Sequence, residues 1–98
     1  MPRVMFSVSY TIKPALRERY LGLIRQLKGV QEGKNKAYSV FETKGKANHF
    51  TEVFTLNSLD EFEAMDDNQD EQTEELISKV GDCVDNQGMK YQTMIEIA

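Results

Sequence analysis

The chain has 98 residues, of which 40% are apolar and 29% charged, and its formal net charge is −4. These values are typical of one globular domain spanning residues 1–98, and they exclude an intrinsically disordered chain. No apolar run approaches the roughly 18 residues of a membrane-spanning helix. A single cysteine, Cys83, cannot form an internal disulfide, so we expect a cytoplasmic protein.

The first third of the chain predicts a strand followed by a helix. Residues 3–12 alternate between two sets of side chains, one of which is apolar, and this period of two is typical of a strand. Pro14 suits the first turn of a helix, where its missing N–H is not needed. Apolar residues then recur at helical spacing, and the pattern predicts that the helix ends near Gly29 and that residues 29–36 form a loop.

A hairpin is predicted next. Residues 37–43 and 49–56 have the composition of strands, and the polar turn between them contains Gly45. Two strands around such a short turn indicate an antiparallel pair.

The last third predicts a second helix and a final strand. Ser58 and Glu61 match a helix capping box, in which each side chain bonds a backbone N–H near the other residue. A break is expected at residues 66–70, after which apolar residues return at helical spacing as far as Val84. Residues 89–97 then alternate again, which predicts a strand.

The predicted order, β-α-β-β-α-β, is that of the ferredoxin-like α+β fold. Right-handed crossovers place both helices on one face of a four-stranded antiparallel sheet. The opposite face combines methionine, hydroxyl and aromatic side chains instead of a continuous charged surface. Because a second copy of the sheet would cover this surface, we expect a homodimer.

Residues 50–65, FTEVFTLNSLDEFEAM, complete a pattern that resembles the dimeric α/β-barrel superfamily, and in particular antibiotic-biosynthesis-monooxygenase-like proteins. The resemblance covers nearly the whole chain. It implies two sheets face to face and, in each subunit, a cavity between sheet and helices that binds small hydrophobic compounds. Some members are cofactor-independent oxygenases, and others are isomerases or haem-degrading enzymes. The chain has no tryptophan, so the asparagine, tryptophan and histidine set of the haem-degrading members cannot be assembled.

Three side chains are candidate acids or bases. His49 is the only histidine, but it lies three residues from Glu52 and therefore on the opposite face of the strand, so a His49–Glu52 dyad is disfavoured. Glu42 and Glu52 each interrupt an apolar alternation. The hairpin could bring their carboxylates together and raise the pKa of one of them, although an exposed or lysine-paired glutamate is the simpler interpretation.

The candidate ligand-pocket residues are Tyr10, Tyr38 and Phe54, which alternate with the polar positions of the strands. Cys83 has no basic neighbour that would activate its thiol. No metal site is expected, because the chain has too few cysteine and histidine ligands, and no cofactor is expected, because it has no nucleotide-binding fingerprint.

Two functions remain open. The first is a small homodimeric barrel that binds a hydrophobic or aromatic small molecule and acts as a cofactor-independent monooxygenase-like enzyme. The alternative is a non-catalytic ligand-binding or regulatory dimer. The ferredoxin-like topology also serves in RNA binding, but the acidic balance of this chain and its poor match to the aromatic–glycine RNA signature disfavour a nucleic-acid partner.

Overall fold

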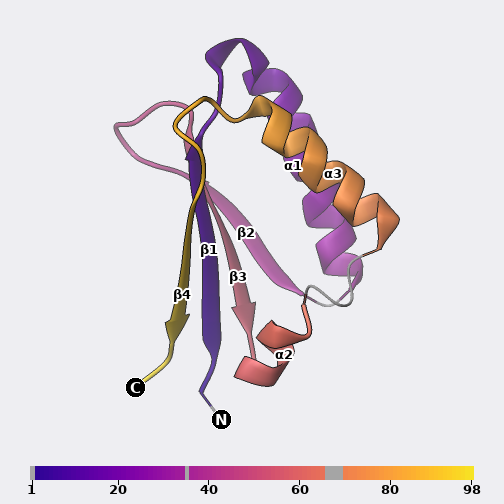
Figure 1. Cartoon of the computed structure of the whole chain (residues 1–98), viewed down its shortest axis with the longest axis vertical. Helices are drawn as coiled ribbons and strands as arrows, with labels where there is room; N and C mark the ends of the chain where they lie inside the picture. Colours follow the sequence, from indigo (N-terminus) through magenta and orange to yellow (C-terminus); the bar gives the residue numbers. More distant parts are fainter. Residues whose placement is uncertain (1, 35, 66–69) are drawn as a thin grey trace.

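The computed structural model describes residues 2–34, 36–65 and 70–98, and its elements follow the predicted order (Figure 1). The first half consists of β1 (Val4–Thr11), the 3-10 turn η1 (Pro14–Leu16), α1 (Arg17–Gly33) and β2 (Ala37–Glu42). The second half consists of β3 (His49–Leu56), α2 (Leu59–Glu63), α3 (Glu71–Cys83) and β4 (Lys90–Ile95).

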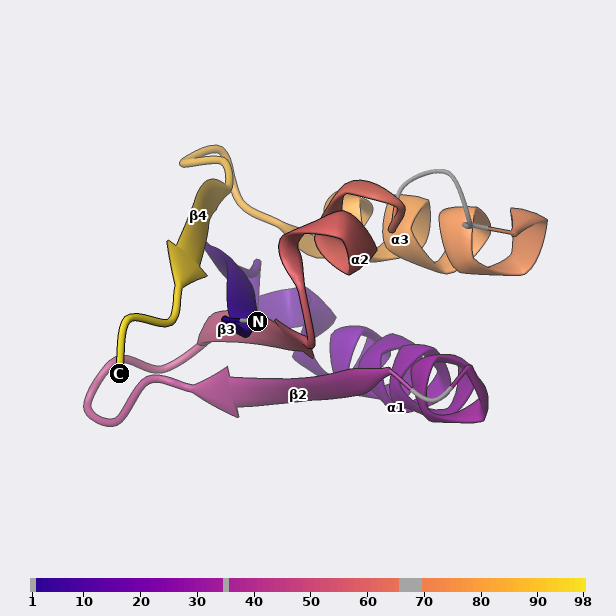
Figure 2. The ribbon, with the colours of Figure 1, turned by 90° about the horizontal axis from the view of Figure 1, so that it is seen from below.

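The sheet has four strands in the order β2-β3-β1-β4, and every neighbouring pair is antiparallel. This arrangement confirms the predicted α+β ferredoxin-like fold. Helices α1 and α3 lie side by side over the same face of the sheet, as Figures 1 and 2 show. Strand β4 forms one edge, and all six of its residues are exposed.

The core lies between the sheet and the two long helices. It is built by the apolar set of β1, by the apolar stripe of α1 and by one side of α3, because alternation in a strand and the 3.6-residue period of a helix each direct one set of side chains inward. Tyr38 from β2 and Phe50 from β3 complete it. The buried cluster consists of Val8, Tyr10, Ile12, Tyr20, Leu23, Ile24, Leu27, Tyr38, Phe50, Leu76, Val80 and Cys83.

Helix α1 is longer than the sequence predicts. It continues through Gly29 to Gly33, so the predicted loop at residues 29–36 is wrong for its first part. The apolar stripe explains the difference: Val30 packs partly against the core, and Gln31, one turn after Leu27, is buried. Burial of this extra turn outweighs the low helix propensity of the two glycines.

The capping prediction is confirmed in part. The Ser58 hydroxyl accepts the Glu61 N–H at 3.1 Å, while the Glu61 carboxylate accepts the N–H of Asn57, one residue earlier than predicted. Of the predicted break, residues 66–69 lie outside the described residues, and Asp70 caps α3 by accepting the Thr73 N–H at 2.8 Å.

The face of the sheet opposite the helices carries large apolar side chains. Met5, Phe41 and Met94 are exposed there, by 42%, 60% and 39%. Around them are hydroxyl residues, among which Ser9 and Thr51 bond each other at 2.9 Å. Within the described ranges, no helix is both long and apolar enough to cross a membrane.

Candidate functional site

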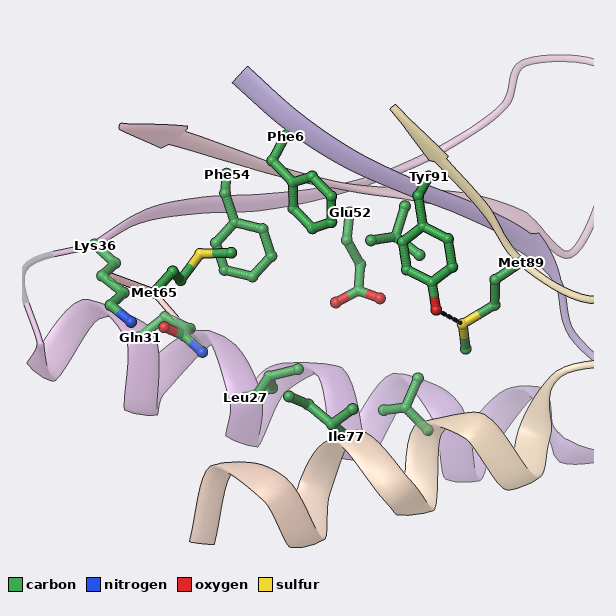
Figure 3. Close-up of a pocket in the computed structure, with 12 residues that line it drawn as sticks. Phe6, Leu27, Gln31, Lys36, Glu52, Phe54, Met65, Ile77, Met89 and Tyr91 are labelled. Carbon is green, nitrogen blue, oxygen red and sulfur yellow. Dashed lines mark hydrogen bonds between the residues drawn. The ribbon is translucent and has the colours of Figure 1, made fainter. Parts of the chain in front are cut away.

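A cavity of about 180 Å³ lies between the helix-facing side of the sheet and the helices (Figure 3). Its walls are mostly apolar and include several aromatic rings. Four of the described side chains bring polar groups to it: the carboxylate of Glu52, the amide of Gln31, the ammonium of Lys36 and the hydroxyl of Tyr91, which donates to the Met89 sulfur at 3.3 Å. The lining residues are Phe6, Val8, Leu27, Gln31, Lys36, Glu52, Phe54, Met65, Ile77, Val80, Met89 and Tyr91.

Glu52 extends from the middle of the sheet into this apolar space. Strand β3 runs between β1 and β2, and the register places Glu52 directly opposite Val8 and Val40. Its side chain is only 8% exposed. A carboxylate is costly to bury without hydrogen-bond donors, so its partners decide whether the position is tolerable.

Two tyrosines supply those donors. The Tyr38 hydroxyl donates to one carboxylate oxygen of Glu52 at 2.6 Å, and the Tyr10 hydroxyl donates to the other at 2.8 Å. The Tyr20 hydroxyl lies 2.7 Å from that of Tyr10. Because Tyr10 gives its single proton to Glu52, Tyr20 is the donor in this pair. The result is a buried network in which Tyr20 donates to Tyr10, while Tyr10 and Tyr38 each donate to one oxygen of the carboxylate.

Burial sets the protonation behaviour of this cluster. It raises the pKa of Glu52, and the hydrogen bonds from Tyr38 and Tyr10, which favour the charged form, oppose burial without cancelling it. Burial likewise raises the pKa of the three phenols. The phenols therefore stay protonated near neutral pH, and Glu52 holds a proton more tightly than an exposed glutamate does.

Glu42 does not share this environment. Its two oxygens accept from the guanidinium of Arg17 at 2.6 and 3.0 Å, and one of them also accepts the Asn48 N–H at 2.9 Å. These bonds lower the pKa of Glu42 to about 2. The two glutamates thus have separate partners, and burial rather than a neighbouring carboxylate raises the pKa of Glu52.

His49 lies on the other side of the sheet. Its Nδ1 is 3.0 Å from the Thr11 hydroxyl, and the ring is half-buried beside the hairpin turn. The alternation of β3 keeps it away from Glu52, as the spacing of three residues predicts.

The predicted pocket residues take two positions. Phe54 lines the cavity, whereas Tyr10 and Tyr38 reach it through their bonds to Glu52. The sequence interpretation missed Gln31 and Lys36, because both fall in the segment predicted as a loop. Continuing the stripe of α1 one turn beyond Leu27 would have found Gln31.

The described part of the chain also bears on two other kinds of site, a metal cluster and a reactive thiol. No group of three or more histidine, cysteine, aspartate or glutamate side chains there could hold a metal ion. Cys83 is fully buried, and burial raises the pKa of its thiol, which makes it a poor nucleophile.

No family model matches the chain, and no curated protein matches it. Solved structures do match. An antibiotic biosynthesis monooxygenase is 18% identical with a TM-score of 0.82, and the match covers 97% of this chain and 99% of that one. A conserved protein from Methanosarcina mazei is 12% identical with a TM-score of 0.78, over 96% and 92% of the two chains. A variant of SnoaB, a cofactor-independent oxygenase from Streptomyces nogalater, is 10% identical with a TM-score of 0.74, over 94% and 90%.

Identities this low show the fold alone. The chain therefore has the ferredoxin-like fold of antibiotic-biosynthesis-monooxygenase-like proteins, and the predicted resemblance is confirmed at that level.

Proposed function

We propose that the chain binds a small hydrophobic or aromatic molecule in the cavity and that Glu52 acts on it as a general base. One observation carries this proposal. Among the described residues that line the cavity, Glu52 is the only carboxylate, and phenols hold both of its oxygens while burial raises its pKa. A raised pKa brings a carboxylate toward the range in which a general base works at neutral pH.

The size of the cavity indicates the size of the ligand. An apolar protein cavity of about 150 Å³ takes up benzene, so about 180 Å³ suits a single substituted ring. Phe6, Phe54 and Tyr91 form an aromatic part of the wall. The ring centroid of Phe6 lies 6.2 Å from that of Phe54 and 6.2 Å from that of Tyr91. Aromatic walls of this kind favour a planar ligand.

The chemistry starts with a proton transfer. Glu52 removes an acidic proton from a C–H or O–H bond of the ligand, and the bonding electron pair stays on the ligand. The ammonium of Lys36, which also lines the cavity, favours the anion that forms. Such an anion can be oxidised by dioxygen without a cofactor: a methylene becomes a carbonyl, one oxygen atom entering the product and the other leaving as water with the two hydrogens.

Oxygen consumption tests this function. Aromatic compounds with an acidic methylene are incubated with the wild type, with Glu52→Gln and with Glu63→Gln, a control on the exposed surface of α2. We expect the Glu52 variant to lose roughly 100-fold or more of the rate, which is the usual contribution of a general base, and the control to lose nothing. Binding without any turnover in the wild type would favour the alternative, a ligand-binding or regulatory protein.

We also propose a homodimer formed through the open face of the sheet. The support is the exposed apolar surface of Met5, Phe41 and Met94, which a second copy would cover. Light scattering after size exclusion tests it: the wild type should have twice the mass of the chain, and Phe41→Lys should shift it toward the monomer. A monomeric wild type at micromolar concentration would contradict this assembly.

A further inference from the structure

Gln31 is a buried polar residue of the cavity wall that the proposed base chemistry leaves unused. Its side chain is 3% exposed and lines the cavity from α1. Its backbone carbonyl accepts the N–H groups of Lys34 and Lys36, both at 3.0 Å. Its side-chain oxygen, by contrast, is buried and has no hydrogen-bond partner among the described residues. Buried acceptors are almost always paired, so an unpaired one beside a cavity indicates a missing donor.

We propose that the amide oxygen of Gln31 accepts a hydrogen bond from the ligand, so that the cavity selects an aromatic ring with donor groups, hydroxyl or N–H, at two positions. One donor faces Glu52 and the other faces Gln31. This inference rests on the proposed function, because it assigns the ligand class of the same cavity.

The positions of the two acceptors support a ligand that spans the cavity. Glu52 comes from β3, in the sheet, and Gln31 comes from α1, in the helix layer, so the two acceptors belong to opposite walls (Figure 3). A ring lying between these walls presents substituents to both. A ring with one donor can bond only one of the two walls, and when that donor is the proton that Glu52 accepts, Gln31 stays unpaired.

The same geometry predicts discrimination. A site that is built to bond a ligand hydroxyl rejects an analogue that lacks it, because the buried acceptor of the site is then left without a partner. Methylation of one hydroxyl of a benzenediol removes a donor while it keeps the ring and the oxygen atom. Diols and their monomethyl ethers therefore report directly on Gln31.

The experiment is anaerobic calorimetry with the isomeric benzenediols and their monomethyl ethers, so that binding is measured without turnover. The proteins are the wild type, Gln31→Met, which keeps the length of the side chain and removes the amide, and Gln26→Met, the same change at an exposed position of α1. We expect at least one diol to bind the wild type about tenfold tighter than its ether. This preference should disappear in Gln31→Met and persist in Gln26→Met.

Thermal unfolding without ligand gives a second readout. Gln31→Met should raise the Tm, because it removes an unpaired polar group from an apolar site. A diol preference that survives in Gln31→Met, or its absence in the wild type, would overturn this inference. If single-hydroxyl phenols still bind and Glu52→Gln weakens them, the proposed function stands and only the role of Gln31 fails. If none of these rings binds, both proposals fail.

Discussion

Replacing Glu52 by glutamine separates the charge of the buried carboxylate from its shape. Glutamine has the same length, and its oxygen can still accept from Tyr38 while its amide N–H donates to the Tyr10 oxygen. Tyr10 is then free to donate its own proton to Tyr20, 2.7 Å away. The buried network remains paired, so the main change is the loss of ionisation at this position.

The pH dependence of stability follows from the direction of the pKa shift. Burial raises the pKa of Glu52 above its ordinary value of 4.5, which we take for the unfolded chain, so the folded protein binds this proton more tightly. The resulting stability is fully present below the unfolded pKa and is lost as the pH rises through the folded pKa. The glutamine variant has no such loss. From below the unfolded pKa to above the folded pKa, it should gain about 1.4 kcal/mol on the wild type for each unit that separates the two pKa values.

Urea unfolding across this pH range measures the effect for the wild type, Glu52→Gln and the exposed control Glu63→Gln. Weaker hydrogen bonds can cost the variant a fixed amount of stability. This amount is the same at every pH, so it cancels when the difference in unfolding free energy between variant and wild type at one pH is subtracted from that at another. The control makes the same change on the exposed surface of α2, so it shows whether the pH effect belongs to the buried carboxylate. If the difference between Glu52→Gln and the wild type stays constant, or if the wild type gains on the variant as the pH rises, burial does not control the ionisation of Glu52.

Three further substitutions or measurements address neighbouring features. Tyr38→Phe removes the 2.6 Å hydrogen bond to Glu52, and this should lower the free energy of unfolding in urea at neutral pH by about 1.5–3 kcal/mol. NMR should show a further rise in the pKa of Glu52. A loss below about 0.5 kcal/mol would contradict the bond. Arg17→Ala should return the pKa of Glu42 from about 2 toward its ordinary value of 4.5, and the stability that the wild type loses as the pH falls across this window should shrink; an unchanged NMR titration would contradict the ion pair. Cys83 should react with Ellman's reagent only when the chain unfolds, whereas prompt labelling of the native protein would contradict its burial.

The sequence is sufficient to predict the fold because strands, helices and turns are determined by residues that are close together in the chain. The alternation of β1 and β3 and the turn at Gly45 determine strands and register, and Glu52 is recognisable because it interrupts Phe50 and Phe54 on an inward-facing set. The partners of Glu52 are not predictable in this way. Tyr10 lies 42 residues away from it and Tyr38 lies 14, and only the packed sheet brings their hydroxyls to the carboxylate.

The end of α1 is a second feature that depends on tertiary packing and not on local sequence. Gly29 locally favours a stop, and only the tertiary packing of Val30 and Gln31 carries the helix on to Gly33. The unpaired oxygen of Gln31 could therefore not be predicted from the sequence pattern, because that pattern places the residue in a solvated loop. For Glu42, the hairpin places the residue correctly on its strand, but Arg17, 25 residues away at the start of α1, decides its protonation.

The buried network around Glu52 serves either the stability of the fold or the function of the cavity. Unfolding measurements on variants can distinguish the two. Glu52→Met alone leaves Tyr10 and Tyr38 without their acceptor, which should cost about 2 kcal/mol or more. Combining it with phenylalanine at Tyr10, Tyr20 and Tyr38 removes every polar partner at once. Replacement of a whole buried polar network by apolar side chains is often neutral or stabilising, so this quadruple variant should match the wild type within about 1 kcal/mol or exceed it.

Chemical denaturation of the two variants and the wild type shows whether the network is needed for stability. Recovery of stability in the quadruple variant would mean that the fold does not need the carboxylate and its phenols, and that they are present because the cavity uses them. If the quadruple variant is instead less stable than Glu52→Met, the hydrogen bonds themselves hold the sheet to α1, and the inference from this network to a catalytic base loses its energetic support.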